Sequence, residues 1–242
     1  MLALLADIHA NLEALEACLA DARGRGATRY VFLGDLVGYG ADPAAVLRVI
    51  RGYAAEGAVV VQGNHDAAVA RSTGGLSEGA RDTILWTREV LGKEEISWLG
   101  SLPLCVREER ICFVHASAAS PARWEYLDDP ASAKRSAEAA GSCWTFGGHV
   151  HHQMLYFGTA GGAMSAFVPV PGSPVPTPRT RRWVAIAGSV GQPRERNPAA
   201  AYALFDPQRE TLTFRRVPYD HEAPARKVRA AGLPDLFARW AP

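Results

Sequence analysis

Chemically active side chains occur in five short clusters, and each cluster follows an apolar segment of the sequence. The clusters hold Asp7 and His9; Asp35; Asn64, His65 and Asp66; His115; and His149 with His151. Their oxygen and nitrogen atoms are ligands that suit Mn²⁺, Fe²⁺, Zn²⁺ or Co²⁺, and the absence of cysteine from the clusters disfavours Cu(I) and iron–sulfur centres. Asp35 stands alone between two groups, and one carboxylate can bridge two metal ions about 3.5–4 Å apart.

The first half of the chain alternates between predicted strands and helices that would carry these clusters. Residues 2–6, 30–33 and 58–61 are short apolar runs and predict strands. Residues 12–22 have helical spacing, and Asp42-Pro43 predicts the start of a second helix. This alternation predicts parallel βαβ units. Because the carboxyl ends of parallel strands meet at one crevice, we expect the clusters to converge there.

The second half of the chain has a different sequence pattern, in which short apolar runs are separated by turns. We expect these runs to form antiparallel strands, and we expect the Pro-rich residues 172–180 to form a surface loop. Residues 77–100 predict one long helical stretch, with Leu85 and Val90 among its core candidates, and residues 222–239 predict a last helix. We interpret residues 1–242 as a single domain.

The composition is that of a soluble globular protein, since 48% of the 242 residues are hydrophobic and 21% are charged. The sequence holds no apolar run of the roughly 18–20 residues that span a bilayer, and we expect no membrane partner. The four cysteines form no CxxC pair and the first residues do not resemble a signal peptide, so we expect a cytoplasmic protein with reduced thiols. A net charge of +1 argues against a dedicated nucleic-acid surface.

Taken together, the five clusters resemble the calcineurin-like metallophosphoesterase superfamily. The matching motifs are D-x-H at Asp7–His9, G-D-x-x-x-Y-G at Gly34–Gly40, G-N-H-D at Gly63–Asp66, a strand-terminal His115, and G-H-x-H at Gly148–His151. The chain is similar to a small bacterial and archaeal subgroup of phosphodiesterase-like proteins, and this similarity extends to residues 188–194. The resemblance implies a four-layer α/β/β/α sandwich in which two mixed β-sheets are flanked by helices.

The resemblance also implies a ligand set for two divalent ions, with Mn²⁺ expected and Fe, Zn, Co or Ni as alternatives. The first ion would be held by Asp7, His9 and His151, and the second by Asn64, His115 and His149. Asp35 would bridge the two ions. A hydroxide between the ions would attack phosphorus in line with the leaving oxygen.

Four further residues are candidates for contact with the substrate or the leaving group. His65 resembles the non-ligand histidine of the family, which would donate a hydrogen bond or proton to the leaving group or to a phosphate oxygen. Asp66 would either orient His65 or serve as a local turn carboxylate. Asn11 and Arg194 are candidates for phosphate contact, although Arg194 also fits a surface turn.

Three positions depart from the pattern of the subgroup. Ala10 and Ala116 stand where glycine is usual, and Ile186-Ala187 stands where asparagine and proline are usual. Glycine permits a positive φ that alanine resists, so these changes would affect loop geometry and substrate choice more readily than metal binding.

The function predicted on this basis is a phosphodiesterase acting on a small nucleotide-type substrate, with dinucleoside polyphosphates as one option. A phosphomonoesterase with the same site is the nearest alternative, and a non-catalytic metal-binding scaffold for protein partners is a more distant one. A protein serine/threonine phosphatase is disfavoured because the strings here are GDLVGYG and GNHD. A nuclease is disfavoured by the short chain and its neutral charge. The sequence does not define an oligomeric state.

Overall fold

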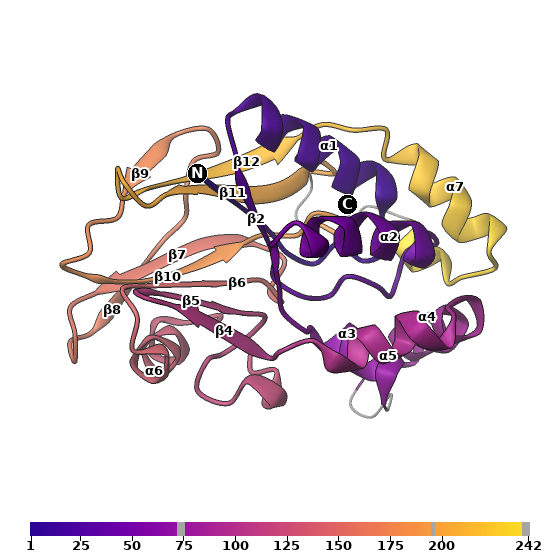
Figure 1. The fold of residues 1–242 in the computed structure, drawn as a ribbon, viewed down its shortest axis with the longest axis horizontal. Helices are drawn as coiled ribbons and strands as arrows, with labels where there is room; N and C mark the ends of the chain where they lie inside the picture. Colours follow the sequence, from indigo (N-terminus) through magenta and orange to yellow (C-terminus); the bar gives the residue numbers. More distant parts are fainter. Residues whose placement is uncertain (72–75, 195–196, 239–242) are drawn as a thin grey trace.

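Two six-stranded β-sheets pack face to face in the computed structural model, which describes residues 1–71, 76–194 and 197–238 (Figure 1). The first sheet has the strand order β3-β2-β1-β11-β12-β9. Its strands are β1 (Leu2–Leu5), β2 (Arg29–Phe32), β3 (Val59–Val60), β9 (Pro174–Pro176), β11 (Ala200–Asp206) and β12 (Thr211–Val217). Strands β1, β2 and β3 run parallel, which confirms the predicted βαβ units.

The second sheet is also mixed, with the strand order β4-β5-β6-β10-β7-β8. Its strands are β4 (Cys105–Glu108), β5 (Ile111–Val114), β6 (Trp144–Gly147), β7 (Gln153–Gly158), β8 (Met164–Phe167) and β10 (Arg182–Ala187). The expectation that the strands of the second half are all antiparallel is wrong, because β5, β6 and β10 pair in parallel. The cause is helix α6 (Pro130–Ala140), which the sequence analysis missed and which provides the crossover between β5 and β6.

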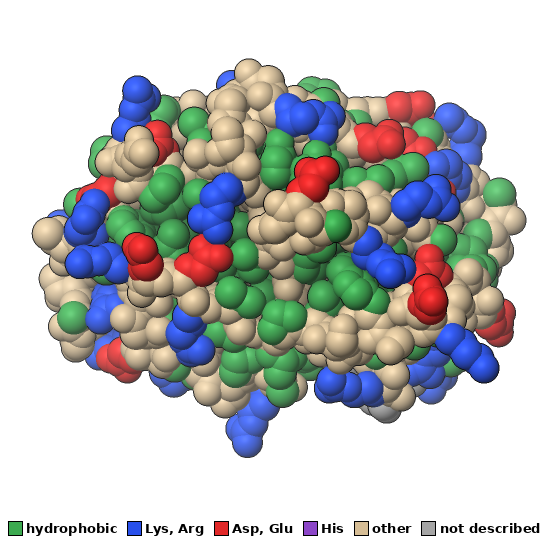
Figure 2. Space-filling view, viewed as in Figure 1, with side chains coloured by type: hydrophobic (Ala, Val, Ile, Leu, Met, Phe, Trp, Pro, Cys, Tyr) green, Lys and Arg blue, Asp and Glu red, His purple; other side chains and the backbone are tan. Residues whose placement is uncertain are grey.

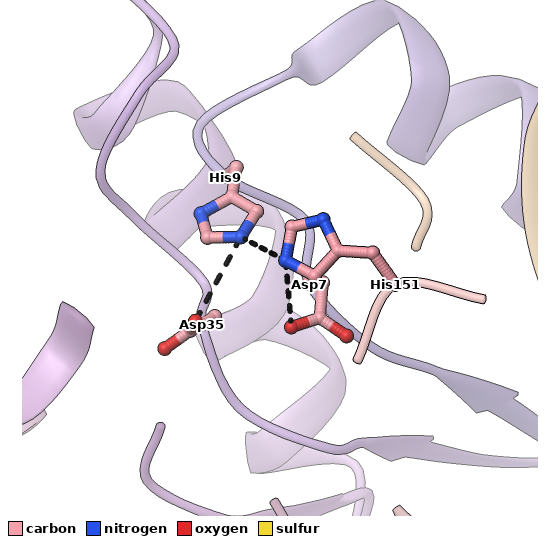
Figure 3. Close-up of side chains that lie close together, drawn as sticks. All are labelled: Asp7, His9, Asp35 and His151. Atoms are coloured by element: carbon pink, nitrogen blue, oxygen red, sulfur yellow. Dashed lines mark hydrogen bonds and ion pairs between the residues drawn. The ribbon is translucent and has the colours of Figure 1, made fainter. Parts of the chain in front are cut away.

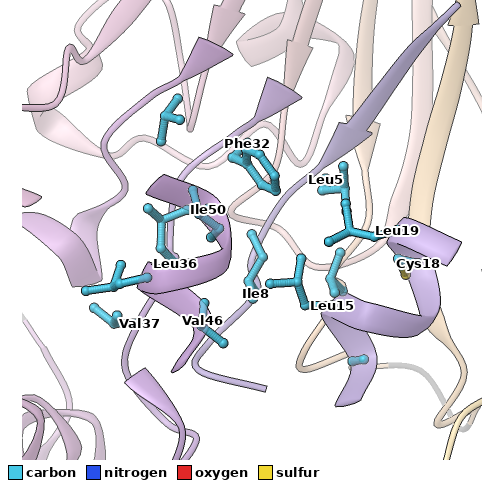
Figure 4. Close-up of a cluster of buried hydrophobic side chains, with 14 of the residues drawn as sticks. Leu5, Ile8, Leu15, Cys18, Leu19, Phe32, Leu36, Val37, Val46 and Ile50 are labelled. Atoms are coloured by element: carbon cyan, nitrogen blue, oxygen red, sulfur yellow. The ribbon is translucent and has the colours of Figure 1, made fainter. Parts of the chain in front are cut away.

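Successive side chains of β1 point to opposite faces of the sheet, so they enter two different cores. Leu2 and Leu4 face the second sheet and pack into the layer that contains Phe146 and Phe205. Leu5, on the opposite face, packs beneath the helices that cover the first sheet (Figure 4). A strand that is buried on both faces reads as a continuous apolar run, as residues 2–6 do.

Helices cover the outer faces of both sheets and complete four layers, as the family resemblance implies. Helices α1 (Leu12–Gly24) and α2 (Pro43–Ala55) lie over the first sheet, and α6 lies over the second (Figure 1). The other helical segments are α3 (Asn64–Ala70), α4 (Glu78–Val90), α5 (Lys93–Ser101), η1 (Pro121–Arg123), α7 (Glu222–Ala230) and η2 (Asp235–Phe237). Across the described residues, every helix is too short or too polar to traverse a lipid bilayer.

Three further expectations for individual segments differ from the structure. The last helix, expected at residues 222–239, ends at Ala230, and η2 follows it after a turn, while residue 239 lies outside the described residues. The helical stretch predicted for residues 77–100 is broken between α4 and α5, and the core candidates Leu85 and Val90 are 44% and 45% exposed. The predicted surface loop at residues 172–180 contains β9. A proline-containing strand is tolerated there because β9 lies at the edge of its sheet, where an unpaired backbone position needs no N–H.

Candidate metal centre

The loops at the carboxyl ends of β1, β2 and β3 lie against those that follow β5, β6 and β10, and all seven predicted metal ligands meet there. The loop after β1 is held on one side by hydrogen bonds from Asp7 N to Gly34 O (3.0 Å) and from His9 N to Asp35 O (2.9 Å). On its other side, Gly191 N donates to Asp7 O (2.9 Å). The backbone of the loop therefore fixes where Asp7 and His9 point.

The first cluster consists of Asp7, His9, Asp35 and His151, which are all buried (Figure 3). The Nε2 atoms of His9 and His151 lie 3.1 Å apart. His151 Nε2 is 3.4 Å from Asp7 Oδ1, and His9 Nε2 is 3.7 Å from Asp35 Oδ2. Two carboxylates and two imidazoles thus surround one small volume.

The second cluster consists of Asp35, His115 and His149. Asp35 Oδ2 lies 3.4 Å from His115 Nε2, and Asn64 Oδ1 lies 3.1 Å from the same nitrogen. The amide of Asn64 therefore joins this cluster as a fourth side chain. Asp35 belongs to both clusters, which is the placement that a bridging carboxylate requires.

The outer nitrogen of each imidazole donates to a backbone carbonyl, and this leaves the inner nitrogen free to bind a cation. His115 Nδ1 donates to Leu33 O (2.8 Å), and His151 Nδ1 donates to Gln192 O (2.6 Å). His9 Nδ1 and His149 Nε2 donate in the same way to Val37 O (3.3 Å) and Trp124 O (2.9 Å). Carbonyl partners of this kind are typical of metal-binding histidines, whose ring orientation and tautomer they fix.

These hydrogen bonds leave a set of donor atoms whose chemistry fits a divalent cation. If the outer nitrogens of His9 and His151 carry the protons, two lone pairs face each other across 3.1 Å. A positive charge between them removes that repulsion. The combination of imidazole, carboxylate and amide donors without sulfur suits Mn²⁺, Fe²⁺, Zn²⁺ or Co²⁺.

Burial lowers the pKa of three of these histidines, which keeps them in the neutral form that binds metals. Burial lowers the pKa of His149 to about 3 and holds the pKa of His9 well below its usual range. Burial, followed by the positive charge of Arg194, holds the pKa of His151 well below its usual range. Burial also acts on His115, but the negative charges of Asp35 and Asp7 outweigh it and raise the pKa of His115 to about 9, so a cation that binds at its Nε2 would displace a proton.

Left-handed backbone conformations occur at five of the seven predicted ligand positions. The φ angles of Asp7, His9, Asp35, His149 and His151 lie between 49° and 68°. Side chains with a Cβ adopt this region at a cost on the order of 1–3 kcal/mol each, and such residues cluster at functional sites. The fold therefore supports a strained set of loops in order to aim these side chains at one point.

The three departures from the subgroup pattern leave this backbone in place. Ala10 adopts a φ of 51°, so the alanine holds the left-handed conformation that glycine would adopt freely. Ala116 has no left-handed φ and is buried. Ile186 and Ala187 lie within β10 in regular pairing with β7. Of these positions, only Ala10 therefore adopts a backbone conformation that favours glycine.

His65 lies beside both clusters, at the start of α3. Its backbone N–H donates to Asp35 Oδ1 (2.8 Å), and its ring packs against the rings of His9 and Tyr39. Its Nδ1 atom is buried and has no hydrogen-bond partner among the residues that the structure describes. A polar atom that is buried without a partner beside a cation site is a feature of functional rather than structural histidines.

Asp66 does not orient His65, and the structure favours the turn alternative for this carboxylate. Its Oδ1 accepts from the backbone N–H groups of Leu36 (2.9 Å) and Val37 (3.3 Å), and its Oδ2 accepts from Gly63 N (2.9 Å). Both oxygens are thus bonded to the backbone. Asp66 joins the loop after β2 to the start of α3, and its predicted catalytic role is corrected to a positioning one.

Asn11 does not face the site as a phosphate ligand. Its Oδ1 caps α1 by accepting from Ala14 N (3.1 Å), and its Nδ2 donates to Gly191 O (2.9 Å) and Tyr219 Oη (3.0 Å). Every polar atom of this side chain is used within the fold, so its predicted role in substrate binding is corrected to a structural one. Arg194, in contrast, is exposed and lines the cavity above the clusters.

A cavity of about 680 Å³ opens onto the two clusters. Asp35, Asn64, His65, His149 and His151 line its floor. Its walls carry three arginines and three aromatic residues, which are Arg71, Arg123, Arg194, Tyr39, Trp124 and Tyr126. Arg71, Arg123 and Tyr126 were not among the residues predicted from the sequence. The string Arg123-Trp124-Glu125-Tyr126, which places basic and aromatic side chains together, was the available signal.

Comparisons with known proteins agree with this architecture. Residues 1–210 match the sequence model of the calcineurin-like phosphoesterase superfamily domain. An uncharacterized protein from Methanocaldococcus jannaschii is 30% identical over 97% of this chain and 94% of its own length.

Two solved structures share the fold over nearly the whole chain. A metallophosphoesterase from Sphaerobacter thermophilus has a TM-score of 0.85 and 33% identity, with 98% of this chain and 96% of that chain covered. A hypothetical protein from Pyrococcus horikoshii has a TM-score of 0.78 and 23% identity over the same shares. The chain belongs to the calcineurin-like phosphoesterase superfamily and is a phosphoester hydrolase.

Proposed function

We propose that this protein is a phosphodiesterase that uses two divalent ions and acts on a small nucleotide-type substrate. Asp7, His9 and His151 hold the first ion in this proposal, and Asn64, His115 and His149 hold the second. Asp35 bridges them, and Mn²⁺ is the expected metal. The observation that carries the proposal is that the two donor clusters share Asp35 on the floor of a cavity with basic and aromatic walls.

Bound divalent ions supply an activated water at neutral pH and neutralise negative charge on the phosphoryl oxygens. The protein supplies the remaining parts. His65 is placed to give a hydrogen bond or proton to the leaving oxygen, and the carbonyls of Leu33 and Gln192 keep the donor nitrogens of His115 and His151 directed inward. Asp66 and the left-handed loops hold these groups in position.

The walls of the cavity favour a nucleotide over a simple phosphate ester. Arg71, Arg123 and Arg194 present fixed positive charges, and an arginine binds phosphate oxygens in a bidentate manner. Tyr126 is 49% exposed, and its ring stacks on His149 with centroids 4.2 Å apart. Trp124 lines the same cavity, and either ring offers an aromatic surface on which a base can stack. Dinucleoside polyphosphates, which combine a base at each end with a polyphosphate chain, are the first substrates to test.

The charge distribution supports a small substrate rather than a nucleic acid. On the face drawn in Figure 2, Lys and Arg side chains are interspersed with acidic ones, in keeping with the net charge of +1. A nucleic-acid surface draws its affinity from the many phosphates that a continuous basic track neutralises. A cytoplasmic location, where nucleotides are abundant, is part of the same proposal.

Hydrolysis of bis-p-nitrophenyl phosphate and p-nitrophenyl phosphate, measured side by side, tests the proposal. The protein is stripped of metal and then supplied with Mn²⁺, Zn²⁺, Co²⁺ or Mg²⁺ in turn. We expect metal-restored activity with preference for the diester, and a panel of nucleotides follows. Preference for the monoester would favour the phosphomonoesterase alternative. Two bound ions without turnover of either compound or of any nucleotide would favour the scaffold.

A further inference from the structure

The C-terminal segment, residues 218–238, lies beyond residues 1–210, which the family's sequence model matches, and it contacts the loops and helix ends beside the site. Tyr219 Oη accepts from Asn11 Nδ2 (3.0 Å), close to the loop that carries His9. Lys227 Nζ, in α7, forms ion pairs with Glu13 (2.5 Å) and Asp42 (2.6 Å) at the N-terminal ends of α1 and α2. These contacts bring the last described turn, η2, to the edge of the site.

Phe237, at the end of η2, stacks directly on an aromatic residue of the site. Its ring lies 4.3 Å from that of Tyr39, with 21° between the planes. The same Tyr39 ring lies 4.4 Å from the ring of His65 and 4.4 Å from the ring of His9. Phe237, Tyr39 and His65 therefore form a continuous series of ring contacts from the C-terminal segment to the site.

The orientation of the His65 ring depends on this packing to a greater extent than is usual for a catalytic histidine. An active-site imidazole is commonly oriented by a carboxylate or carbonyl on its second nitrogen. Within the described part of the chain, Nδ1 of His65 has no such partner, and the carboxylate of Asp66 is bonded to backbone amides. Gly38 lies so close that a Cβ there would be 2.5 Å from Nδ1. Steric contacts with neighbouring residues therefore set the orientation of the His65 ring, and Tyr39 is one of these neighbours.

Tyr39 in turn needs an external support. Its backbone is held in a left-handed conformation (φ 64°), and its N–H donates to Thr83 Oγ1 (3.2 Å). These contacts fix the main chain, while the outer face of the ring is covered by Phe237. We propose that Phe237 is a positioning residue that acts through Tyr39 to set the orientation of His65, so that the C-terminal segment completes the active site. This inference rests on the proposed role of His65.

The test compares Phe237→Ala, Phe237→Tyr and the control Leu236→Ala. Leu236 is 59% exposed in the same turn; its side chain lies near Gly79, as that of Phe237 also does, but only Phe237 stacks on Tyr39. Rates are measured for methyl p-nitrophenyl phosphate and methyl phenyl phosphate. Phenolate is the poorer leaving group and benefits more from a proton donor. General acid catalysis contributes about 10²–10⁴-fold, so we expect Phe237→Ala to lower kcat for the phenyl ester at least about tenfold more than for the p-nitrophenyl ester.

Two controls identify the route of the effect. Phe237→Tyr keeps the ring and is expected to restore both rates, whereas Leu236→Ala is expected to match the wild type. In a His65→Ala background, Phe237→Ala is expected to cause no further loss of rate, because the effects of two substitutions that act through one group do not add. Equal losses on both esters, or additive losses with His65→Ala, would overturn the proposal. Loss of bound metal in Phe237→Ala would overturn it as well, because the effect would then pass through His9.

A spectroscopic measurement separates this proposal from the proposed function. Imidazole ¹H–¹⁵N NMR spectra report the surroundings of His65 whether or not any ester is hydrolysed, and His65→Ala assigns its signals. We expect these signals to shift in Phe237→Ala, to return in Phe237→Tyr and to stay unchanged in Leu236→Ala. Unshifted signals in Phe237→Ala would refute the positioning role. Wild-type protein that hydrolyses no phosphodiester would refute the proposed function alone.

Discussion

Replacement of Asp35 by asparagine removes the one carboxylate that the two donor clusters share. Oδ2 of this residue lies 3.4 Å from His115 Nε2 and 3.7 Å from His9 Nε2, between the two groups. Its Oδ1 accepts from the backbone N–H of His65 at 2.8 Å, and the amide oxygen of asparagine can accept the same bond. The substitution therefore removes a negative charge from the site and keeps the local hydrogen bond.

The size of the effect follows from the charge that is lost. Two unit charges 4 Å apart interact by about 4 kcal/mol at an effective dielectric constant of 20. A loss of about 4 kcal/mol corresponds to about a thousandfold at 1.36 kcal/mol for each factor of ten. We expect kcat/KM for the preferred diester to fall at least about a thousandfold in Asp35→Asn, together with the metal content of the purified protein.

The fold is expected to survive this change. Asparagine is close to aspartate in size, and a buried amide has a smaller desolvation cost than a buried charge. The free energy of unfolding of the metal-free protein is expected to change by less than about 2 kcal/mol. Urea denaturation, metal analysis and steady-state kinetics measure the three quantities, with the exposed Asp82→Asn in α4 as a control. Full metal content and near-wild-type activity in Asp35→Asn would refute the bridging role.

Three other predictions concern metal affinity and stability. In Gly148→Ala the new Cβ would lie 2.4 Å from Asp7 Oδ2, so we expect at least about tenfold weaker Mn²⁺ binding by calorimetry. Gly52→Ala is the matched control, because its Cβ meets open space, and this variant should bind Mn²⁺ as the wild type does. Removal of metal should lower the melting temperature, because an ion at 100 times its Kd stabilises by about 2.7 kcal/mol, or roughly 5–10 °C for a chain of this size; an unchanged melting temperature would contradict this. Partial burial raises the pKa of Asp21, but hydrogen bonds from Arg25, Tyr202 and Arg215 outweigh it and lower the pKa. The stability that its charge contributes is therefore fully present above the unfolded pKa of about 3.9 and is lost as the pH falls through the lower, folded pKa. Asp21→Asn should cost about 1 kcal/mol at pH 7 and less at pH 3, and an equal cost at both values would show that the charge is not involved.

The convergence of the seven candidate ligands could be predicted because each lies in a loop that the local sequence marks. Asp7 and Asp35 lie two and three residues after the ends of β1 and β2, and the topology of parallel strands brings such positions together. The pairing direction of β5, β6 and β10 could not be read in the same way, since a short apolar run is equally compatible with either direction. Helix α6 has a start signal, with Asp129 as the N-cap and Pro130 in the first turn, that was missed among the short strands.

The roles of the polar residues beside the ligands depend on contacts distant in the chain. Asn11 donates to Tyr219, which is 208 positions away, and Asp66 accepts from the loop 30 residues before it. No local pattern distinguishes such a residue from one that faces a substrate. Arg71 and Tyr126 could not be predicted for the same reason, because only the folded chain places both in the wall of one cavity.

Anomalous X-ray diffraction from crystals of the protein grown with Mn²⁺ tests the central claim most directly. The account predicts two peaks about 3.5–4 Å apart, one on each side of Asp35. The first would be coordinated by Asp7, His9 and His151, and the second by Asn64, His115 and His149. A single peak that does not contact Asp35, or no peak among these side chains, would contradict it.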